Sequence, residues 1–403
     1  MGVLEELYNM TAFGAIAEEP GVLLMLLIGF VLLYLGITKK YEPLLLVPIA
    51  FGVILANLPG GGMGVVAAEK IELEGDRYMN LFEIGSEFGI MNYLYFALLK
   101  TGFIPPIIFM GVGALTDFGP MLRNLRLAFF GAAAQIGIFS VIFGAIAMGF
   151  TLQEAGALGI IGGADGPTAI YTTIMLAPHL LGPIAIAAYS YMALVPVIIP
   201  LIANMLMSKE DFLINMKQQD KLYPPKYEIK NLKLVKILFP VILGVTVALF
   251  VPSSVPLLGM LLFGNLIKEV GTITQRLSDA ATGPIMNTAT IFLGLAVGGT
   301  MTHNVFLDMR TLGIIVGGFM AFAISIGGGI TAVKIYNMFA KKKINPLIGA
   351  TGLSAVPMAS RVANDLGLEH DQNNHLLQYC MASNISGVIG SAVAAGVLIS
   401  ILG

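Results

Sequence analysis

Long apolar stretches separated by short polar segments dominate this sequence and decide what the chain can fold into. Of its 403 residues, 57% are hydrophobic and only 11% are charged, whereas a soluble domain carries about 25% charged residues. Stretches of this kind are buried in a bilayer, where the backbone must satisfy its own hydrogen bonds within helices. The composition therefore predicts an all-α polytopic membrane protein with about ten membrane spans. We place the spans near residues 21–38, 43–57, 102–121, 127–149, 179–206, 236–251, 254–268, 284–300, 310–335 and 376–402.

The rest of the composition argues against several functions. A net charge of −2 gives no reason to expect nucleic acid as a partner. The single cysteine, Cys380, rules out an intramolecular disulfide and a cysteine-based metal site. The four histidines lack the spacing of a zinc-binding helix. The acidic N-terminus has no basic region of a signal peptide, so we expect residues 1–20 to form an amphipathic helix.

The positions of the basic residues set the direction in which each span crosses the membrane. Lysine and arginine are enriched on the cytoplasmic side, so the hydrophilic segment 208–235 is predicted to be a cytoplasmic loop. The span 127–149 leaves from Arg126 on that side, and the span 179–206 returns to it. Residues 151–177, which lie between these two spans, must therefore enter and leave the membrane from the outer face.

The second half of the chain gives the opposite result. Lys341-Lys342-Lys343 is placed inside, so residues 344–370 must enter and leave from the inner face. Two broken re-entrant hairpins that enter from opposite faces are typical of inverted-topology repeats, whose binding site lies between them near the midplane. We therefore predict a first membrane repeat over 21–207 and a second over 236–403.

The most informative single residue is Asp165, in the sequence GGADGPT at 162–168. A carboxylate at the bilayer centre costs about 2.5–3.5 kcal/mol and is rarely found there without a function. The Gly-Pro context breaks the helix and frees carbonyls, which could ligate a small hard cation together with Asp165 and Thr168. Sodium and a proton would then compete for one carboxylate. The alternative is a glycine-rich packing bend whose aspartate lies exposed at an interface.

Other polar residues occur at membrane depth. Tyr191, in Tyr189-Ser190-Tyr191 at the middle of a span, is either a hydrogen-bonded helix tyrosine or a group that relays a proton or orients a ligand. Asn384 and Ser386 in the last span complete an oxygen cage or bond across helices.

The second predicted hairpin carries a further set of candidates. Asn345 and Gly349 are four residues apart, and Ser354 and Arg361 are seven apart, so each pair can share a helical face. Arg361 cannot lose its charge and needs a carboxylate or an anionic substrate. It is either an arginine that snorkels to the cytoplasm or an anion site on the inner side.

These motifs resemble a known family. The chain is similar to the membrane-embedded beta subunits of the sodium-translocating, biotin-dependent decarboxylases, which include the oxaloacetate, methylmalonyl-CoA, glutaconyl-CoA and malonate enzymes. The resemblance covers nearly the whole chain. It is most specific in GGADGPTAIY, AIAAYSYMALVP, NPLIGATGLSAVPMASRV and NISGVIGSAVAAGV, and weakest over residues 59–100 and in the central loop.

The resemblance implies roles for individual residues, with Asp165 as the essential aspartate. It implies a catalytic set and a partly overlapping set of sodium ligands, and it marks Arg361 and Tyr191 as the residues that bind carboxybiotin. The catalytic set is Asp165, Tyr191, Ser354 and Arg361, and the sodium set is Asp165, Asn345, Gly349, Ser354 and Asn384.

The resemblance also implies a mechanism and partners. A carboxyltransferase alpha subunit loads a separate biotin carrier, and this chain decarboxylates the carboxybiotin, consumes a proton and drives sodium outward. The biotin is not on this chain, because its closest match to the attachment sequence, around Lys217, is poor. A small one-span gamma or delta subunit, a trimer of membrane units and a bacterial or archaeal inner cell membrane are further expectations.

Two other functions use some of the same residues. A secondary sodium/proton antiporter or a sodium-coupled organic anion symporter would also need broken hairpins and Asp165. An intramembrane aspartyl protease would need two facing aspartates, and the sequence offers no second aspartate at the membrane centre.

Overall fold

The structure is a computed structural model that describes residues 11–12, 14, 16, 19–40, 42–66, 68–73, 77–224, 229–307, 309–355 and 358–403. The amphipathic helix predicted over residues 1–20 falls almost entirely outside this part of the chain. Helices make up the described fold, apart from one antiparallel pair of two-residue strands.

The first half contains both long apolar helices and short connecting elements. Its elements are α3 (Gly21–Ile37), α4 (Pro43–Ala56), η1 (Ala68–Ile71), β1 (Glu72–Leu73), β2 (Arg77–Tyr78), α5 (Leu81–Leu94), η2 (Tyr95–Leu99), α6 (Ile104–Leu115), α7 (Gly119–Arg123), α8 (Leu125–Ala134), α9 (Ile136–Ala147), α10 (Leu152–Gly159), η3 (Ile160–Gly163), α11 (Gly166–Leu176), η4 (Pro178–Leu180) and α12 (Leu181–Leu206).

Two short helices form the central loop, and the second half follows. The elements are α13 (Lys209–Phe212), α14 (Met216–Leu222), α15 (Leu232–Phe250), η5 (Pro252–Ser254), α16 (Val255–Val270), α17 (Gln275–Ala280), η6 (Ala281–Ile285), α18 (Met286–Gly299), α19 (His303–Phe306), α20 (Met309–Phe339), α21 (Leu347–Ala350), α22 (Met358–His370) and α23 (Leu377–Leu402).

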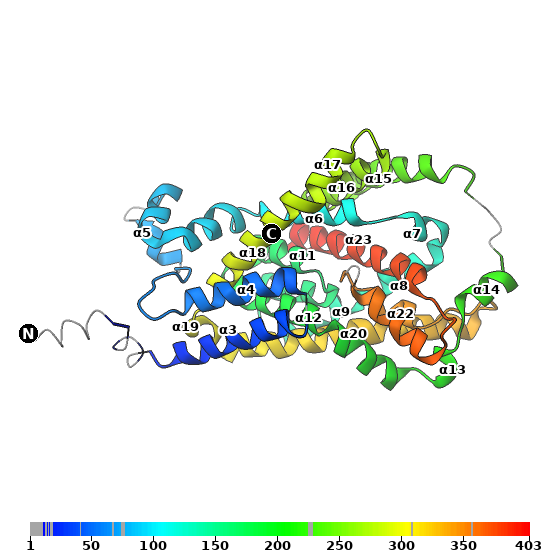
Figure 1. Cartoon of the computed structure of the whole chain (residues 1–403), viewed down its shortest axis with the longest axis horizontal. Helices are drawn as coiled ribbons and strands as arrows, with labels where there is room; N and C mark the ends of the chain where they lie inside the picture. The colour runs from blue at the N-terminus through cyan, green and yellow to red at the C-terminus, as the bar shows by residue number, and fades with distance from the viewer. Residues whose placement is uncertain are drawn as a thin grey trace, which may run out of the picture.

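The all-α membrane architecture predicted from the sequence is confirmed. In the described chain six helices are long and apolar enough to cross a bilayer, and eight are if each of two bent pairs is one span. The number falls below the predicted ten at α3 and α4, which are apolar but only 17 and 14 residues long; a straight span needs about 20 residues. The long helices lie along the long axis of the molecule, with α5 at one end and α13 and α14 at the other (Figure 1).

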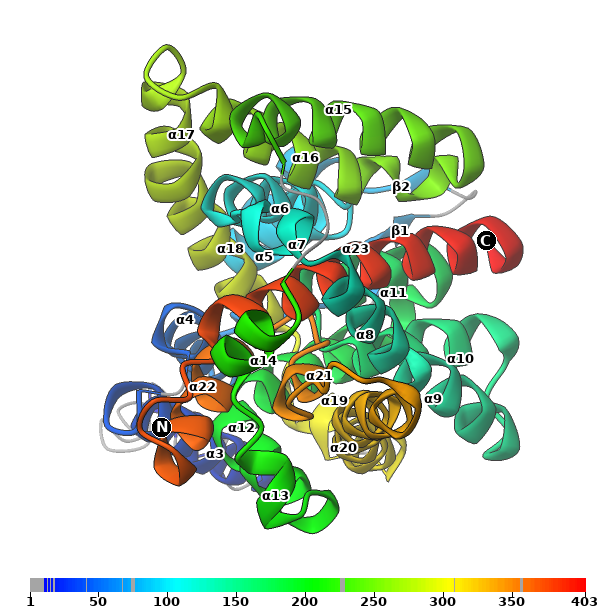
Figure 2. The same ribbon diagram turned by 90° about the vertical axis from the view of Figure 1, so that its right-hand side faces the viewer.

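Helix packing follows the same pattern in the two halves. In the first half α3 packs on α4, and in the second α15 packs on α16; α4 then contacts α18, while α16 contacts α6. Likewise α12 contacts α20, and α23 contacts α8. Figure 2 looks along the long axis and shows α15 to α17 on one side of the bundle and α3, α12 and α20 on the other. In the contacts of α4 with α18, α16 with α6, α12 with α20 and α23 with α8, a helix of one half contacts a helix of the other half, as two structurally related halves would do. The inverted repeat itself stays a prediction.

The pair formed by α6 and α16 depends on glycine. A β-carbon on Gly264 would collide with the carbonyl oxygen of Met110, and one on Gly113 would collide with that of Leu261. The close approach also lets the Asn265 amide donate to two carbonyls at the end of α6, at 3.3 Å and 2.8 Å. Small residues at such crossings are the usual route to tight packing of membrane helices.

The substitution Gly264→Ala should therefore destabilise the protein. The added methyl has no space, so we expect the two helices to move apart at a cost of about 1–3 kcal/mol. Thermal unfolding in detergent, followed by size-exclusion chromatography, measures the loss. Gly144→Ala in α9 is the matched control, because a β-carbon there meets nothing within 4 Å. Equal stability of the two variants would contradict the prediction.

Candidate ion-binding site

The first hairpin consists of α10, η3 and α11. Its mouth, the end where the chain enters and leaves the bundle, lies at the start of α12. Thr151 and Glu154 form a capping box that begins α10. The Glu154 carboxylate also contacts Nε2 of His179, immediately before α12, at 2.9 Å. Both ends of the hairpin are therefore at the same end of the bundle, as expected for residues 151–177.

The second hairpin, which contains α21 and α22, has its mouth at the opposite end of α12. Nδ2 of Asn345 donates to the carbonyls of Phe212 and Ile214 in the central loop, at 3.1 Å and 3.0 Å. Nδ2 of Asn374, beyond the other end of the hairpin, donates to the same two carbonyls at 3.1 Å and 3.2 Å. The two hairpins thus enter the bundle from opposite ends.

The tips of the two hairpins meet inside the bundle. The amide of Ser354 donates to the carbonyl of Gly163 at 3.0 Å, which joins the two turns directly. Next to this contact the Ser354 hydroxyl donates to Oδ2 of Asp165 at 2.7 Å. A second hydroxyl, that of Ser391 on α23, donates to the same oxygen at 2.7 Å.

Asp165 is the N-cap of α11, and local sequence explains why. Its Oδ1 accepts from the amide of Thr168 at 3.1 Å, and Pro167 occupies the first turn, where no amide is needed. The N-terminal end of a helix favours a negative charge. The carboxylate is 4% exposed, and no lysine or arginine of the described chain forms an ion pair with it. It is therefore a buried anion stabilised by hydroxyls, an amide and a helix terminus.

This arrangement leaves oxygen atoms available to bind a cation. An ionised carboxylate offers about four acceptor positions, and Asp165 uses three of them for the bonds above. The hydroxyls of Thr168 and Tyr189 are buried and have no hydrogen-bond partner among the described residues. No group of three or more histidine, cysteine, aspartate or glutamate side chains in the described chain could hold a metal ion. The site suits a monovalent cation held by one carboxylate and neutral oxygens.

The two tyrosines of the Tyr-Ser-Tyr motif lie in different places. The ring of Tyr189 packs against Gly166, where a β-carbon would collide with it, so Tyr189 lies beside the turn that carries Asp165. The ring of Tyr191 packs on Gly318 and, edge to face at 6.1 Å, on Phe319 of α20. The structure therefore brings Tyr189 against the Asp-Gly-Pro turn, whereas Tyr191, the predicted carboxybiotin-binding residue, packs on α20.

The other predicted residues support the second hairpin. Asn345 binds the central loop and makes no contact with Asp165, whereas a β-carbon on Gly349 would collide with the backbone of Gly329 in α20. Nδ2 of Asn384 donates to the carbonyls of Thr351 and Leu353, at 3.2 Å and 2.6 Å, and so holds the tip. Of the predicted sodium ligands, only Ser354 touches Asp165.

Arg361 lies apart from the tip, exposed in the first turns of α22. Its positive charge acts on Glu42, which precedes α4. Burial raises the pKa of the Glu42 carboxyl, and the positive charge of Arg361 acts in the opposite direction. Arg361 is therefore an exposed positive charge near the start of α22, in the second hairpin.

Sequence reasoning missed three residues at the tips. They are Ser391, which donates to Asp165; Ser325 on α20, whose hydroxyl donates to the carbonyl of Gly162 at 2.5 Å; and Gln135, between α8 and α9, whose amide donates to the carbonyl of Gly352 at 3.4 Å. Each is one small polar residue in an apolar span. A lone polar residue in an apolar span is therefore the only indication that the sequence gives. Many helix serines show the same pattern and bond only within their own helix.

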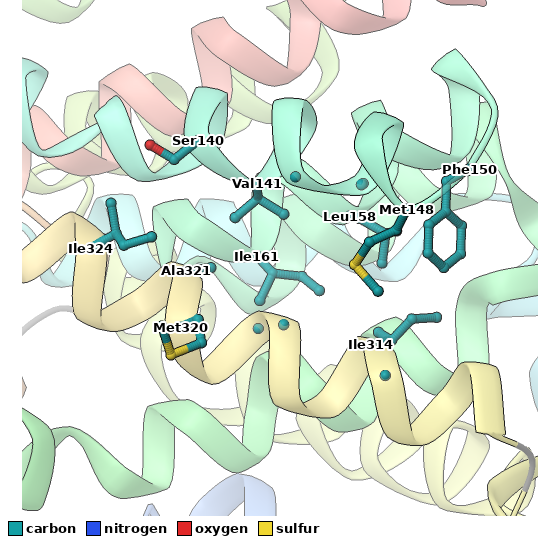
Figure 3. A pocket seen from close by; sticks show the side chains of 15 residues that line it. Ser140, Val141, Met148, Phe150, Leu158, Ile161, Ile314, Met320, Ala321 and Ile324 are labelled. Atoms are coloured by element: carbon teal, nitrogen blue, oxygen red, sulfur yellow. The ribbon is translucent and has the colours of Figure 1, made fainter.

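A separate cavity of about 270 Å³ lies between α9 and α20. Figure 3 shows side chains of both helices and of the first hairpin around it, almost all of them apolar. The hydroxyl of Ser140, the single oxygen among its labelled side chains, donates to the carbonyl of Ile136 in its own helix at 2.8 Å. This cavity offers no ligands for an ion, so the candidate site is the one at the hairpin tips.

The fold and this site define a multi-pass membrane protein of the ion-transporting class, in which a buried carboxylate lies between two opposed broken hairpins. Comparison with known proteins gives the family. Residues 21–402 match the family model of the Na+-transporting oxaloacetate decarboxylase beta subunit. The chain belongs to this family and is therefore a subunit of a multi-subunit decarboxylase.

Individual relatives are similar over almost their full length. The chain is 47% identical to the methylmalonyl-CoA decarboxylase subunit beta of Propionigenium modestum, covering 99% of this chain and 98% of that protein. It is 45% identical to the probable oxaloacetate decarboxylase beta chain of Vibrio cholerae, with 96% of both chains covered. It is 44% identical to the oxaloacetate decarboxylase beta chain of Klebsiella pneumoniae, with 94% of both covered.

The substitution Ser391→Ala should weaken cation binding. It removes one of two hydroxyls that position the same carboxylate oxygen, and loss of such a partner commonly lowers metal affinity by about tenfold or more. The measurement is the sodium concentration that half-activates CO2 release by the decarboxylase complex. Thr173→Val is the matched control, because Thr173 is equally buried but bonds within its own helix at 2.6 Å. An unchanged sodium requirement in Ser391→Ala would contradict the assignment.

Proposed function

We propose that this chain is the membrane subunit of a sodium-pumping decarboxylase. It decarboxylates carboxybiotin presented by a partner carrier and couples this step, with consumption of a proton, to outward movement of sodium. The observation that carries the proposal is the buried carboxylate of Asp165 at the junction of two hairpins that come from opposite ends of the bundle. The family membership supplies the reaction class.

The chemistry needs a proton as well as an ion. When carboxybiotin loses CO2, the bond between the carboxylate carbon and the ureido nitrogen breaks, and its electron pair remains on nitrogen, which takes up a proton. Asp165 holds either sodium or a proton, so uptake of a proton there releases the sodium. The Ser354 and Ser391 hydroxyls stabilise the ionised carboxylate in its sodium-bound form.

The energy balance requires such coupling. Moving one sodium ion outward against ~100 mV and a tenfold gradient costs about 2.3 + 1.4 ≈ 3.7 kcal/mol. A carrier without an energy source cannot supply this. Decarboxylation of carboxybiotin is the proposed source of this free energy.

Arg361 is proposed to bind the carboxylate of carboxybiotin. Its exposure in the first turns of α22, in the hairpin whose mouth lies at the central loop, suits an anion delivered by a soluble carrier domain. A guanidinium can bind a carboxylate through two parallel hydrogen bonds. Tyr191 is assigned to orient this group in the family, but its ring packs on α20, which supports Tyr189 as the tyrosine nearer the ion.

We also propose the orientation of the chain. Lys342 pairs with Asp220 of the central loop at 2.7 Å, so the basic cluster at 341–343 and the loop are at one end of the bundle (Figure 1). The positive-inside rule makes this end cytoplasmic. The exchange of helix partners between the halves supports inverted repeats, with the first hairpin open to the outside.

The proposed assembly contains chains beyond this one. A carboxyltransferase alpha subunit, a biotin carrier and a small one-span gamma or delta subunit are proposed partners in a bacterial or archaeal cell membrane, with three membrane units per complex. The relatives are named for oxaloacetate and methylmalonyl-CoA decarboxylases, so the substrate is proposed to be one of these classes. The carboxyltransferase selects between them.

The proposal is tested by Asp165→Asn in the reconstituted complex. Asparagine keeps the shape of the side chain but cannot carry the charge or exchange a proton. We expect sodium-dependent CO2 release and ²²Na+ uptake into liposomes to fall by at least about a hundredfold, since the charged ligand is lost. Full sodium-dependent activity of the variant would exclude the proposal. Sodium transport by the wild-type chain alone, without carboxybiotin, would instead favour a secondary transporter.

The substitution Arg361→Gln tests the second site separately. Loss of a charged hydrogen bond of about 1.5–3 kcal/mol should raise the KM for carboxylated carrier by roughly 10–100-fold. With saturating carrier the sodium concentration for half-activation should change much less, because Arg361 forms no hydrogen bond with Asp165 in the described structure. Arg126→Gln, also exposed and at the start of α8, is the control for general loss of positive charge. An equal rise of KM in both variants would contradict a specific role.

A further inference from the structure

Gln135 occupies an unusual position for an amide side chain. It lies at the break between α8 and α9, in the middle of the apolar span Leu125–Ala147, and is only 7% exposed. A buried polar side chain in such a place is expected to be fully hydrogen-bonded. In Gln135 the amide nitrogen Nε2 is hydrogen-bonded, whereas the amide oxygen Oε1 is not.

The amide nitrogen faces three carbonyl oxygens from three different elements. Nε2 lies 3.3 Å from the oxygen of Gly131 in α8, 3.4 Å from that of Gly352 at the tip of the second hairpin, and 3.4 Å from that of Gly387 in α23. If the amide were turned over, its oxygen would face three other oxygens. The donors therefore fix the orientation of the group, and Oε1 must point the opposite way.

The side-chain oxygen lies against the turn that carries Asp165. Oε1 is buried and has no hydrogen-bond partner among the described residues. A β-carbon built on Gly163 would lie 3.5 Å from Oε1 and 3.2 Å from Cβ of Ser391. Gly163 belongs to the turn that carries Asp165, and the Ser391 hydroxyl bonds to Asp165 itself. Oε1 and Ser391 thus lie against the same turn.

We propose that Oε1 of Gln135 is a ligand of the transported cation. The inference rests on the proposed function and adds a residue to its site. A hard cation such as sodium binds oxygen atoms and needs several of them, whereas a proton needs a single acceptor. A neutral oxygen against the turn that carries Asp165 therefore favours sodium over a proton at the shared carboxylate. The same side chain positions the second hairpin through Nε2, so ion binding and the position of this tip are linked through one residue.

Ser325 provides a comparison within the same structure. Its hydroxyl donates to the carbonyl of Gly162 at the tip of the first hairpin, as Nε2 of Gln135 does for the second. Ser325 therefore supports a tip, but its hydroxyl is used in that bond. A variant at this position reports the effect of loosening a tip without removal of an oxygen that faces the ion.

The test uses four variants of the complete decarboxylase complex in liposomes: Gln135→Leu, Gln135→Met, Gln135→Glu and Ser325→Ala. CO2 release and ²²Na+ uptake are measured against sodium concentration at several pH values. Gln135→Leu and Gln135→Met lose the oxygen, and should raise the KM for sodium about tenfold or more. This increase should grow as the pH falls, because protons compete better when a sodium ligand is missing.

The other two variants separate the ligand from the support. Gln135→Glu keeps an oxygen and adds a negative charge, but loses the donors to the three carbonyls. We therefore expect a lower kcat without the tenfold rise of the KM for sodium. Ser325→Ala should likewise lower kcat and leave this KM unchanged. A wild-type KM in either Gln135→Leu or Gln135→Met, or the same KM shift in all four variants, would overturn the inference.

Failure of the proposed function would look different. In that case the wild-type complex itself would release CO2 without a sodium requirement. Equilibrium binding of ²²Na+ to the purified complex then tests Gln135 independently of turnover, and Gln135→Met should lower the affinity about tenfold. Unchanged binding would overturn the inference. Should Gln135→Leu fail to assemble on size-exclusion chromatography, the nearly isosteric Gln135→Met carries the test.

Discussion

The hydrogen bonds to the carboxylate of Asp165 are the interactions on which the rest of the structure depends. A charge at the centre of a bilayer costs about 2.5–3.5 kcal/mol even on insertion scales, and here no basic side chain of the described chain offsets it. The compensation comes from Ser354, on the second hairpin, and from Ser391, on α23. Because these groups are distant in sequence, the site forms only when both hairpins and the last helix are in place.

Glycines make that convergence possible. A β-carbon on Gly387 would collide with the carbonyl oxygen of Gly352, and one on Gly352 would lie 2.6 Å from Cβ of Ala134 and 2.9 Å from the oxygen of Phe130. The second tip thus fits between α8 and α23 only without side chains at the contact. Its carbonyls at 351, 352 and 353 then reach the amides of Asn384 and Gln135. The unwound backbone is satisfied by protein side chains, as it must be where water is excluded.

The sequence was sufficient to predict the helical membrane fold and the two broken hairpins, because a charge, glycines and prolines within apolar spans leave few alternatives. The family resemblance, and not the spacing, put Ser354 in one candidate set with Asp165. It was insufficient for Ser391 and Gln135. In a span that is apolar on all sides, no hydrophobic pattern tells which face meets a hairpin tip. The same ambiguity applies to the Tyr-Ser-Tyr motif, since residues two apart point to different sides of a helix. Tyr189 lies beside the turn that carries Asp165, and Tyr191, which the resemblance favoured, packs on α20. Asn345 was expected among the sodium ligands, but it lies at the mouth of its hairpin, where it binds the central loop. Sequence spacing does not show how far apart the mouth and the tip of a hairpin lie.

The separation of the two charged sites has a consequence for coupling. Arg361 lies exposed in the first turns of α22, and Ser354, at the tip of the same hairpin, bonds to Asp165. An anion bound at Arg361 therefore acts on the same short segment that holds the ion site, and it needs no path through the long helices. Because the tips are joined by the bond from Ser354 to Gly163, a small shift of the second hairpin changes the donors to Asp165. A change in those donors alters the preference of the carboxylate for sodium or a proton, which is the quantity that a pump of this kind must control.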